Sequence, residues 1–279
     1  MERTHLLLGL AVLAVAAILI VLIVNQDPQG GLSQISARIV GLNDNANRDV
    51  LYQTSTFTAL LRGLYDGDFT FGELKKKGDF GIGTFNGLDG EMVELDGVVY
   101  QIKSDGTAYI ADNSMKTPFS TVTFFDSDSS TLLDRELDDT QLSQYLDGLL
   151  PSKNIFYAIK IDGVFSRVKT RSVPKQDKPY QPLLEVVKNQ PTFEFSNVSG
   201  TIVGFWSPEY VTGLNVPGYH LHFITRDLKS GGHVLEYEPV DVSIQIDYTT
   251  EFDMVLPQNS DFYGVELVEQ VGETDKVEK

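Results

Sequence analysis

The chain has no cysteine, only four histidines, and far fewer basic than acidic side chains in its 279 residues. Without cysteine, neither a disulfide nor a thiolate metal site is possible. The 22 Lys and Arg against 39 Asp and Glu give a formal net charge of −17. This balance argues against nucleic acid as a partner, because phosphate binding needs a cationic surface, and it disfavours adhesion to anionic lipid.

The glycine-dense segment at residues 78–85, GDFGIGTF, lacks the features of a phosphate loop. It has no Gly-Lys-Ser/Thr ending, and the pattern after it does not predict a helix. Tight backbone packing or a turn explains this segment as well as a functional role does.

One long hydrophobic run is present, and it lies at the start of the chain. Residues 6–24 are nineteen uncharged, strongly apolar residues, which is long enough to cross a bilayer as one helix. No small-x-small cleavage site ends the run, so an uncleaved anchor is favoured over a cleaved secretory signal. Arg3 precedes the run and the next basic residue is Arg38, so we expect the following domain to lie outside the cytoplasm, anchored or secreted.

Three of the four histidines lie within fourteen residues, and this cluster is the most informative feature of the sequence. His220 and His222 are two apart in a run of strand-forming residues, so both imidazoles project from one face and can reach one ion. With His233 they supply three neutral nitrogen ligands, which is the number that catalytic zinc sites use while leaving one position open. Polar histidines on a solvated strand face are the weaker interpretation.

The register of the hairpin that joins these histidines is left open by the sequence. A turn at residues 229–230 would place His233 ~13 Å along the strand from His222, too far apart to share a zinc ion. A turn at residues 227–228 would pair the two histidines. It would also put residues 231–232, both glycine, inside the return strand, which suggests a bulge or a close backbone approach.

Periodicity along the chain predicts a mostly antiparallel β protein with few helices, of the α+β (mixed α/β) class. Two hairpins are expected, with turns at Asp96-Gly97 and Asp162-Gly163. Helices are expected over residues 55–64, with Ser55 as the N-cap, and over residues 139–150 and 182–189. Strands after the second hairpin are expected over residues 192–195, 200–206, 218–225, 233–240 and 242–248.

The chain is expected to divide into four parts. About 250 residues follow the hydrophobic run, enough for one large or two modest domains. The parts are an anchor or signal at residues 1–24, a tether at 25–48, an N-terminal α/β domain at 49–180, and a C-terminal metal-binding β domain with a catalytic tail at 181–279.

Charged side chains interrupt two of the predicted strands. Glu91 opens an apolar strand, where a carboxylate either ends a hairpin or serves as an acid or base. Arg167, Lys169 and Arg171 alternate along one strand and therefore share a face. Such a stripe suits a carboxylate ligand, because arginine can bind one through two parallel hydrogen bonds. A solvated edge strand explains the same spacing equally well.

Four segments together resemble alpha-acetolactate decarboxylase, over about residue 51 to the C-terminus. They are residues 78–92 (GDFGIGTFNGLDGEM), 117–125 (TPFSTVTFF), 167–171 and 204–236 (GFWSPEYVTGLNVPGYHLHFITRDLKSGGHVLE). The resemblance implies a two-domain α/β protein, usually a homodimer, that converts 2-acetolactate, a 2-hydroxy-3-keto acid, to (R)-acetoin and CO2. A membrane anchor departs from the usual form of that family.

The resemblance also assigns roles to single residues. It implies that a zinc ion is held by His220, His222 and His233. Of the remaining site residues, it makes Glu91 the catalytic acid or base, places Thr84 near the metal, and turns Arg171 toward the substrate. A glutamate near the C-terminus also approaches the zinc, and the best match is Glu278, with Glu273 as the alternative.

Two other functions fit the same residues. One is a zinc hydratase or hydrolase with three histidine ligands, and the other is a membrane-tethered metal-binding module without catalysis. An enzyme should need Glu91 and Arg171, whereas metal capture should need only the histidines. A site of three histidines also accepts Co, Ni, Mn or Fe.

Overall fold

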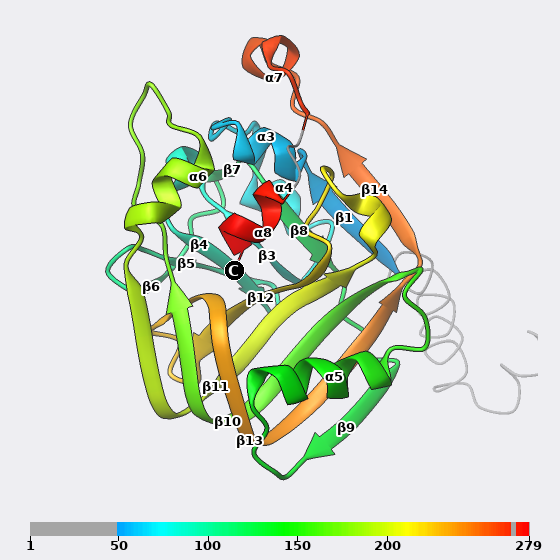
Figure 1. Cartoon of the computed structure of the whole chain (residues 1–279). Helices are drawn as coiled ribbons and strands as arrows, with labels where there is room; N and C mark the ends of the chain where they lie inside the picture. The colour runs from blue at the N-terminus through cyan, green and yellow to red at the C-terminus, as the bar shows by residue number, and fades with distance from the viewer. Residues whose placement is uncertain (1–48, 269–271, 279) are drawn as a thin grey trace, which may run out of the picture. The chain divides into compact units, whose positions relative to one another are not determined.

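Two large β-sheets dominate the computed structural model, which describes residues 49–268 and 272–278 (Figure 1). These residues fall within one compact unit, Arg48–Lys279. Helices are few and short, so the predicted α+β class is confirmed. The anchor and tether expected over residues 1–48 lie outside the described residues.

The first sheet has seven strands in the order β14-β1-β8-β3-β4-β5-β6, and only the β1–β14 pair is parallel. The predicted hairpin with the turn Asp96-Gly97 joins β4 to β5, and both turn residues have positive φ. The strands are β1 (Val50–Thr54), β3 (Phe80–Thr84), β4 (Glu91–Leu95), β5 (Val98–Ile102), β6 (Ala108–Ile110), β8 (Ser120–Thr123) and β14 (Glu251–Val255).

The glycine-dense segment forms β3, so its backbone lies in the middle of this sheet. A Cβ added to Gly81 would lie 2.5 Å from the carbonyl oxygen of Thr121 on β8. Close backbone packing, one of the two interpretations of this segment, is therefore confirmed.

The second sheet is antiparallel, in the order β10-β11-β12-β13-β9. Strand β10 also pairs with β13, so four of its strands close into a ring. The strands are β9 (Ser129–Leu133), β10 (Phe156–Arg171), β11 (Thr192–Ser207), β12 (Gly218–Thr225) and β13 (Gly231–Thr249).

The hairpin expected at Asp162-Gly163 is wrong, because both residues lie inside the continuous strand β10. Gly163 pairs with Gly200 on one side and Val242 on the other. A Cβ there would lie 2.1 Å from the carbonyl oxygen of Asp241, so the glycine permits close strand contact and does not make a turn. The four strands expected over residues 192–206 and 233–248 are likewise only two, β11 and β13.

The helices cover parts of the two sheets and cap their ends. Thr56, not the expected Ser55, caps the first helix through a hydrogen bond from the Ala59 amide. The α-helices are α3 (Phe57–Leu61), α4 (Phe71–Leu74), α5 (Asp139–Leu149), α6 (Leu183–Val186), α7 (Ser260–Gly264) and α8 (Glu273–Glu278), and the 3-10 helices are η2 (Asn86–Leu88), η3 (Val187–Asn189) and η4 (Glu209–Val211). A small sheet pairs β2 (Phe69–Thr70) with β7 (Lys116–Thr117).

The two large sheets share a buried apolar cluster. It joins Val93 and Tyr100 of the first sheet to Val203, Phe205 and Ile224 of the second. The second sheet takes β9 and β10 from before residue 180 and the remaining strands from after it. The domain boundary at residues 180 and 181 stays a prediction.

The expected membrane-anchored location needs correction. Among the described residues, no helix is long and apolar enough to cross a membrane. The longest described helix, α5, has 11 residues and spans about 16 Å, roughly half of a bilayer's apolar thickness.

Candidate active site

The three clustered histidines converge at one point between β12 and β13. His222 is paired with His233, which is the register that the turn at residues 227–228 would produce. His220 lies two residues before His222 on the same face of β12. The three ring centroids are 5.2, 5.3 and 5.3 Å apart, and one ligand atom from each ring lies within 4.8 Å of the others.

Two glycines make this register possible. Gly231 and Gly232 begin β13, where a Cβ would lie 2.0 Å from the Phe223 carbonyl oxygen or 2.4 Å from that of Arg171. The close backbone approach expected for residues 231–232 is therefore confirmed, and it brings the end of β10 against the histidines.

The histidines are buried and their environment keeps them neutral. Burial lowers the pKa of His220 to about 3, with the nearby Arg171 guanidinium adding to the effect. Burial likewise holds the pKa of His222 and His233 well below its usual value. Neutral imidazole is the form that binds metal ions, so these three residues could hold one.

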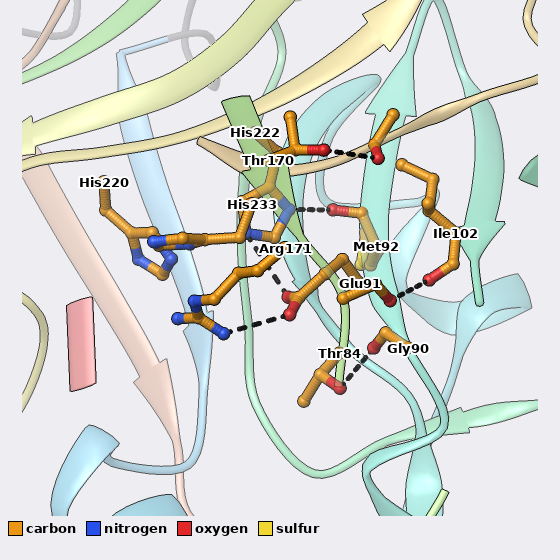
Figure 2. Close-up of polar contacts among 12 residues, drawn as sticks. Thr84, Gly90, Glu91, Met92, Ile102, Thr170, Arg171, His220, His222 and His233 are labelled. Atoms are coloured by element: carbon orange, nitrogen blue, oxygen red, sulfur yellow. Dashed lines mark hydrogen bonds and ion pairs between the residues drawn. The ribbon is translucent and has the colours of Figure 1, made fainter. Parts of the chain in front are cut away.

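A backbone contact orients the central imidazole. His222 Nδ1 lies 2.7 Å from the Met92 carbonyl oxygen and donates to it, which leaves Nε2 as the acceptor (Figure 2). His222 Nε2 is buried and has no hydrogen-bond partner among the described residues. Such an atom is poised to coordinate a metal ion.

Glu91 and Arg171 approach the histidines from β4 and the end of β10. Figure 2 shows the Glu91 carboxylate between the guanidinium and His222. Arg171 Nη1 lies 3.2 Å from Glu91 Oε1, and His222 Nε2 lies 3.6 Å from Glu91 Oε2. Burial raises the pKa of Glu91 to about 7, although the Arg171 charge opposes that rise. This carboxyl group can therefore exchange a proton near neutral pH.

The C-terminal helix α8 brings a second carboxylate to the same place. Glu278 Oε2 lies 3.4 Å from His220 Nε2 and 3.8 Å from His233 Nε2, and Oε1 lies 3.6 Å from Arg171 Nη2. Burial raises the pKa of Glu278 to about 7, opposed by Arg171. The alternative tail residue, Glu273, instead pairs with Arg62 at the other end of α8.

Thr84 lies at the end of β3, directly opposite Glu91 in the sheet. Its hydroxyl donates to the Gly90 carbonyl oxygen at 2.7 Å, which fixes the loop that leads into β4 (Figure 2). Thr84 thus lines the cavity, and its hydroxyl proton is engaged by the backbone.

The cationic stripe of β10 divides between two environments. Arg167 and Lys169 are partly exposed and both pair with Glu236 on the surface. Only Arg171, whose side chain is 5% exposed, reaches the cavity, because β4 and α8 cover the last residue of the strand. The first two residues of the stripe are therefore solvated, although β10 has partner strands on both sides and is not an edge strand. Arg171 is the member that faces the site.

Sequence reasoning missed the apolar wall of the cavity. Its residues come from α3, η2, the residue just before β8, the segment after β10 and the start of α6, which nothing in the local sequence brings together. They are Phe57, Leu60, Leu88, Phe119, Val173 and Leu183. The apolar spacing of the helix expected over residues 55–64 indicated that Phe57 and Leu60 are buried. It did not indicate that they line the site.

Comparison with known proteins identifies the family. The family model described as alpha-acetolactate decarboxylase matches residues 51–269. The chain belongs to the alpha-acetolactate decarboxylase family. The alpha-acetolactate decarboxylase of Methanosarcina mazei is 52% identical over 249 residues, which cover 89% of this chain and 86% of that protein. That of Bacillus subtilis strain 168 is 48% identical over 217 residues, 78% of this chain and 85% of that protein.

Solved structures of this family have the same fold. The crystal structure of alpha-acetolactate decarboxylase from Bacillus subtilis strain 168 matches with a TM-score of 0.79 and 46% identity, covering 82% of this chain and 97% of that one. A Staphylococcus aureus protein described as similar to alpha-acetolactate decarboxylase matches with a TM-score of 0.78 and 31% identity, covering 82% of this chain and 98% of that one. The family and the enzyme class predicted from the sequence are confirmed.

Proposed function

We propose that this site decarboxylates 2-acetolactate to (R)-acetoin and CO2, with a zinc ion held by His220, His222 and His233. The observation that carries the proposal is the meeting of three buried neutral histidines, a buried arginine and two carboxylic acids in one cavity. Membership of the alpha-acetolactate decarboxylase family favours this reaction over a hydratase, a hydrolase or simple metal capture.

The donor set suits zinc. Three imidazole nitrogens are within reach of one another, and the buried Nε2 of His222 and Nδ1 of His233 have no hydrogen-bond partner among the described residues. Carboxyl oxygens of Glu91 and Glu278 lie 3.6 and 3.4 Å from histidine Nε2 atoms, so both acids would lie beside an ion held by the histidines. When bound, zinc supplies Lewis-acid stabilisation of the negative charge that develops on the substrate's carbonyl oxygen as CO2 leaves.

Arg171 is proposed to bind and orient the carboxylate that departs as CO2. Its guanidinium is the cation among the residues that line the cavity, and its buried Nε has no hydrogen-bond partner among the described residues. A planar fork of donors fixes both the position and the plane of a carboxylate. Holding this group in one orientation lowers the entropic part of the barrier.

Glu91 is proposed to deliver the proton that completes the reaction. Loss of CO2 leaves an enediolate, which must be protonated at carbon on one face to give a single enantiomer. With its pKa raised to about 7, Glu91 holds a transferable proton near neutral pH. It reaches the cavity from β4, so it can approach the substrate from one side only.

The apolar wall is proposed to receive the methyl groups of the substrate and to keep water away. Phe57 and Phe119 are each 1% exposed and pack edge to face with ring centroids 5.6 Å apart. Excluding water strengthens the interactions of Arg171 and Glu91 with substrate charge, because the local dielectric constant falls.

Replacement of Glu91 by Gln tests this assignment. The variant keeps the shape of the side chain but cannot deliver a proton. We expect slow decarboxylation with retained zinc, and acetoin of lower enantiomeric purity, measured by chiral chromatography. Glu236→Gln, at an exposed carboxylate of β13, is the matched control and should behave as wild type. Undiminished rate and enantiomeric purity in Glu91→Gln would remove Glu91 from the mechanism.

A further inference from the structure

The last helix of the chain is too short to hold its own position. Helix α8 has six residues, and isolated helices of this length are unstable in water. Chain termini fray unless other contacts hold them. Yet α8 supplies three groups to the site: the Glu278 carboxylate, the Glu278 carbonyl oxygen 3.3 Å from His233 Nε2, and the Val277 carbonyl oxygen, which accepts from Arg171 Nη2 at 3.2 Å. Contacts elsewhere must therefore fix this helix.

One such contact is apolar and lies beside the site. Val277 is 2% exposed and belongs to a cluster with Leu183 and Val186 of α6. This contact holds the last turn of α8 against α6. Val277 is the buried apolar side chain of α8, and one apolar contact near the end of the helix does not by itself set its tilt. The other two buried residues, Glu273 and Thr274, lie in the first turn.

The second contact is an ion pair at the other end of α8. Arg62 Nη1 lies 3.0 Å from Glu273 Oε1, and Nη2 lies 2.8 Å from Oε2. The side chains are 22% and 10% exposed. Arg62 Nη2 also donates to the Val268 carbonyl oxygen. Two parallel hydrogen bonds between charged groups restrict orientation as well as distance.

We propose that Arg62 and Glu273 are positioning residues that hold α8 in the orientation that places Glu278 against the histidines. Neither side chain lines the cavity. Arg62 follows directly on α3, whose Phe57 and Leu60 form part of the cavity wall. The ion pair therefore ties together two helices that contribute to the same site. This inference rests on the proposed function only in the role it gives Glu278.

The Arg62–Glu273 ion pair lies where it can set the tilt of α8. Glu273 and Glu278 are five residues apart, about 7.5 Å along the helix axis. With Val277 as the fixed point near one end, a contact at the other end determines the tilt. Glu273 lies in the first turn, where a negative charge also stabilises the helix itself. Loss of the pair should thus free α8 without disturbing the two sheets.

Three variants of the full chain test the proposal: Arg62→Ala, Arg62→Lys, and the charge exchange Arg62→Glu with Glu273→Arg. The readouts are the rate at which carboxypeptidase releases C-terminal residues, zinc affinity from competition with a chelator, and kcat. Arg226→Ala is the matched control, because Arg226 also forms an ion pair, with Asp162, and both of those side chains are exposed. Thermal unfolding shows whether each variant is folded.

In Arg62→Ala we expect carboxypeptidase release to be roughly fivefold faster and zinc affinity and kcat to fall by a similar factor, as for one lost ion pair. Arg62→Lys keeps the charge without the fork and should lie between Ala and wild type. If the Ala variant does not fold, the comparison of Arg62→Lys with wild type tests the proposal instead. The charge exchange should restore most of the protection, and the control should match wild type.

Unchanged protection and unchanged kcat in Arg62→Ala would overturn the proposal, as would a charge exchange that restores nothing. Failure of the proposed function would be visible separately. In that case wild-type protein would not decarboxylate 2-acetolactate, while the carboxypeptidase readout would still report whether Arg62 and Glu273 hold the helix.

Discussion

At the scale of single residues, Arg171 is the centre of the site's charge balance. Its buried guanidinium lies 3.2 Å from Glu91 and 3.6 Å from Glu278, and its charge opposes the burial that raises the pKa of both acids. A buried charge that loses its partner typically costs 3–5 kcal/mol of stability, roughly the range measured for broken pairs. The three side chains therefore hold one another in place.

Replacing Arg171 by Lys should separate charge from geometry. Lysine keeps the positive charge but loses the planar fork, so it cannot contact both carboxylates and orient a substrate carboxylate as well. We expect kcat/KM to fall by more than roughly tenfold, with zinc content unchanged. Steady-state kinetics and metal analysis measure both.

Arg167→Lys is the matched control, since Arg167 shares the strand but pairs with Glu194 and Glu236 on the surface. It should leave turnover unaffected. Near-normal turnover in the Arg171 variant would show that another group binds the substrate carboxylate.

The residue pattern predicts part of the site by itself. The spacing of His220 and His222 on a strand requires a shared face, and the structure shows that face. The place of Arg171 was not determined by its spacing, because Arg167 and Lys169 have the same pattern and lie on the surface. What distinguishes Arg171 is the covering by β4 and α8, which depends on long-range contacts that local sequence does not encode.

At the scale of elements, helix α8 links the end of the chain to the chemistry. Its sequence is highly polar, and such termini are usually solvated and frayed. The structure instead buries Val277 and directs Glu278 toward the histidines. Local composition could not predict this, because the helix depends on tertiary contacts with α3 and α6.

Truncation after Val271 should therefore cripple turnover. It removes the Glu278 carboxylate and the Val277 carbonyl oxygen, both of which contact Arg171. We expect kcat to fall by roughly a hundredfold or more, as for loss of a strong interaction with the reacting centre. At saturating zinc, the zinc content and the circular dichroism spectrum should stay close to wild type, although zinc affinity should fall as in Arg62→Ala.

Lys276→Ala, at an exposed position of the same helix, is the control and should remain fully active. Full activity in the truncated protein would show that α8 takes no part in the reaction.

Strand β4 carries a second buried acid that the proposed mechanism does not use. Glu94 is fully buried, neither carboxyl oxygen has a hydrogen-bond partner among the described residues, and burial raises its pKa to about 8. The folded protein thus keeps this proton up to about pH 8, whereas the unfolded chain loses it near its ordinary pKa of 4.5. Stability from this group is present below the lower pKa and is lost as pH rises toward the higher one.

Glu94→Gln should remove that part of the pH dependence. Between pH 5 and pH 8, the free energy of unfolding should fall more in wild type than in the variant, by on the order of a few kcal/mol. Urea unfolding at the two pH values measures the difference, and the other buried acids, present in both proteins, cancel. Parallel profiles would mean that Glu94 is ionised in the folded protein.

Elements were predicted well where their signals are local and less well where they depend on partners. The hairpin of β4 and β5 and the helix α5 lie where turn residues and periodicity place them. The turn expected at Asp162-Gly163 is absent because β10 has partners on both sides, and the glycine is needed for their close approach. A dipeptide shows that a turn is possible but does not show which strands lie beside it.

At the scale of the whole molecule, the antiparallel pattern predicted the class and the family-specific segments predicted the enzyme. Local sequence patterns could not predict that the two sheets pack into one compact unit. Nor could they predict that elements of both sheets line the site. The hydrophobic run at residues 6–24 led to a predicted membrane location that the described helices do not support. The homodimer implied by the family resemblance stays a prediction, which sedimentation of the purified protein would test.

The most direct measurement is the reaction itself. Purified protein is incubated with 2-acetolactate, and acetoin and CO2 are quantified against a sample without protein, before and after removal of metal by a chelator and after readdition of zinc. We expect acetoin and CO2 in equal amounts, loss of the activity with the metal, and recovery with zinc. Acetoin formation no faster than in the sample without protein would contradict decarboxylation at this site. Full activity in protein from which the chelator has removed the metal would contradict its dependence on zinc.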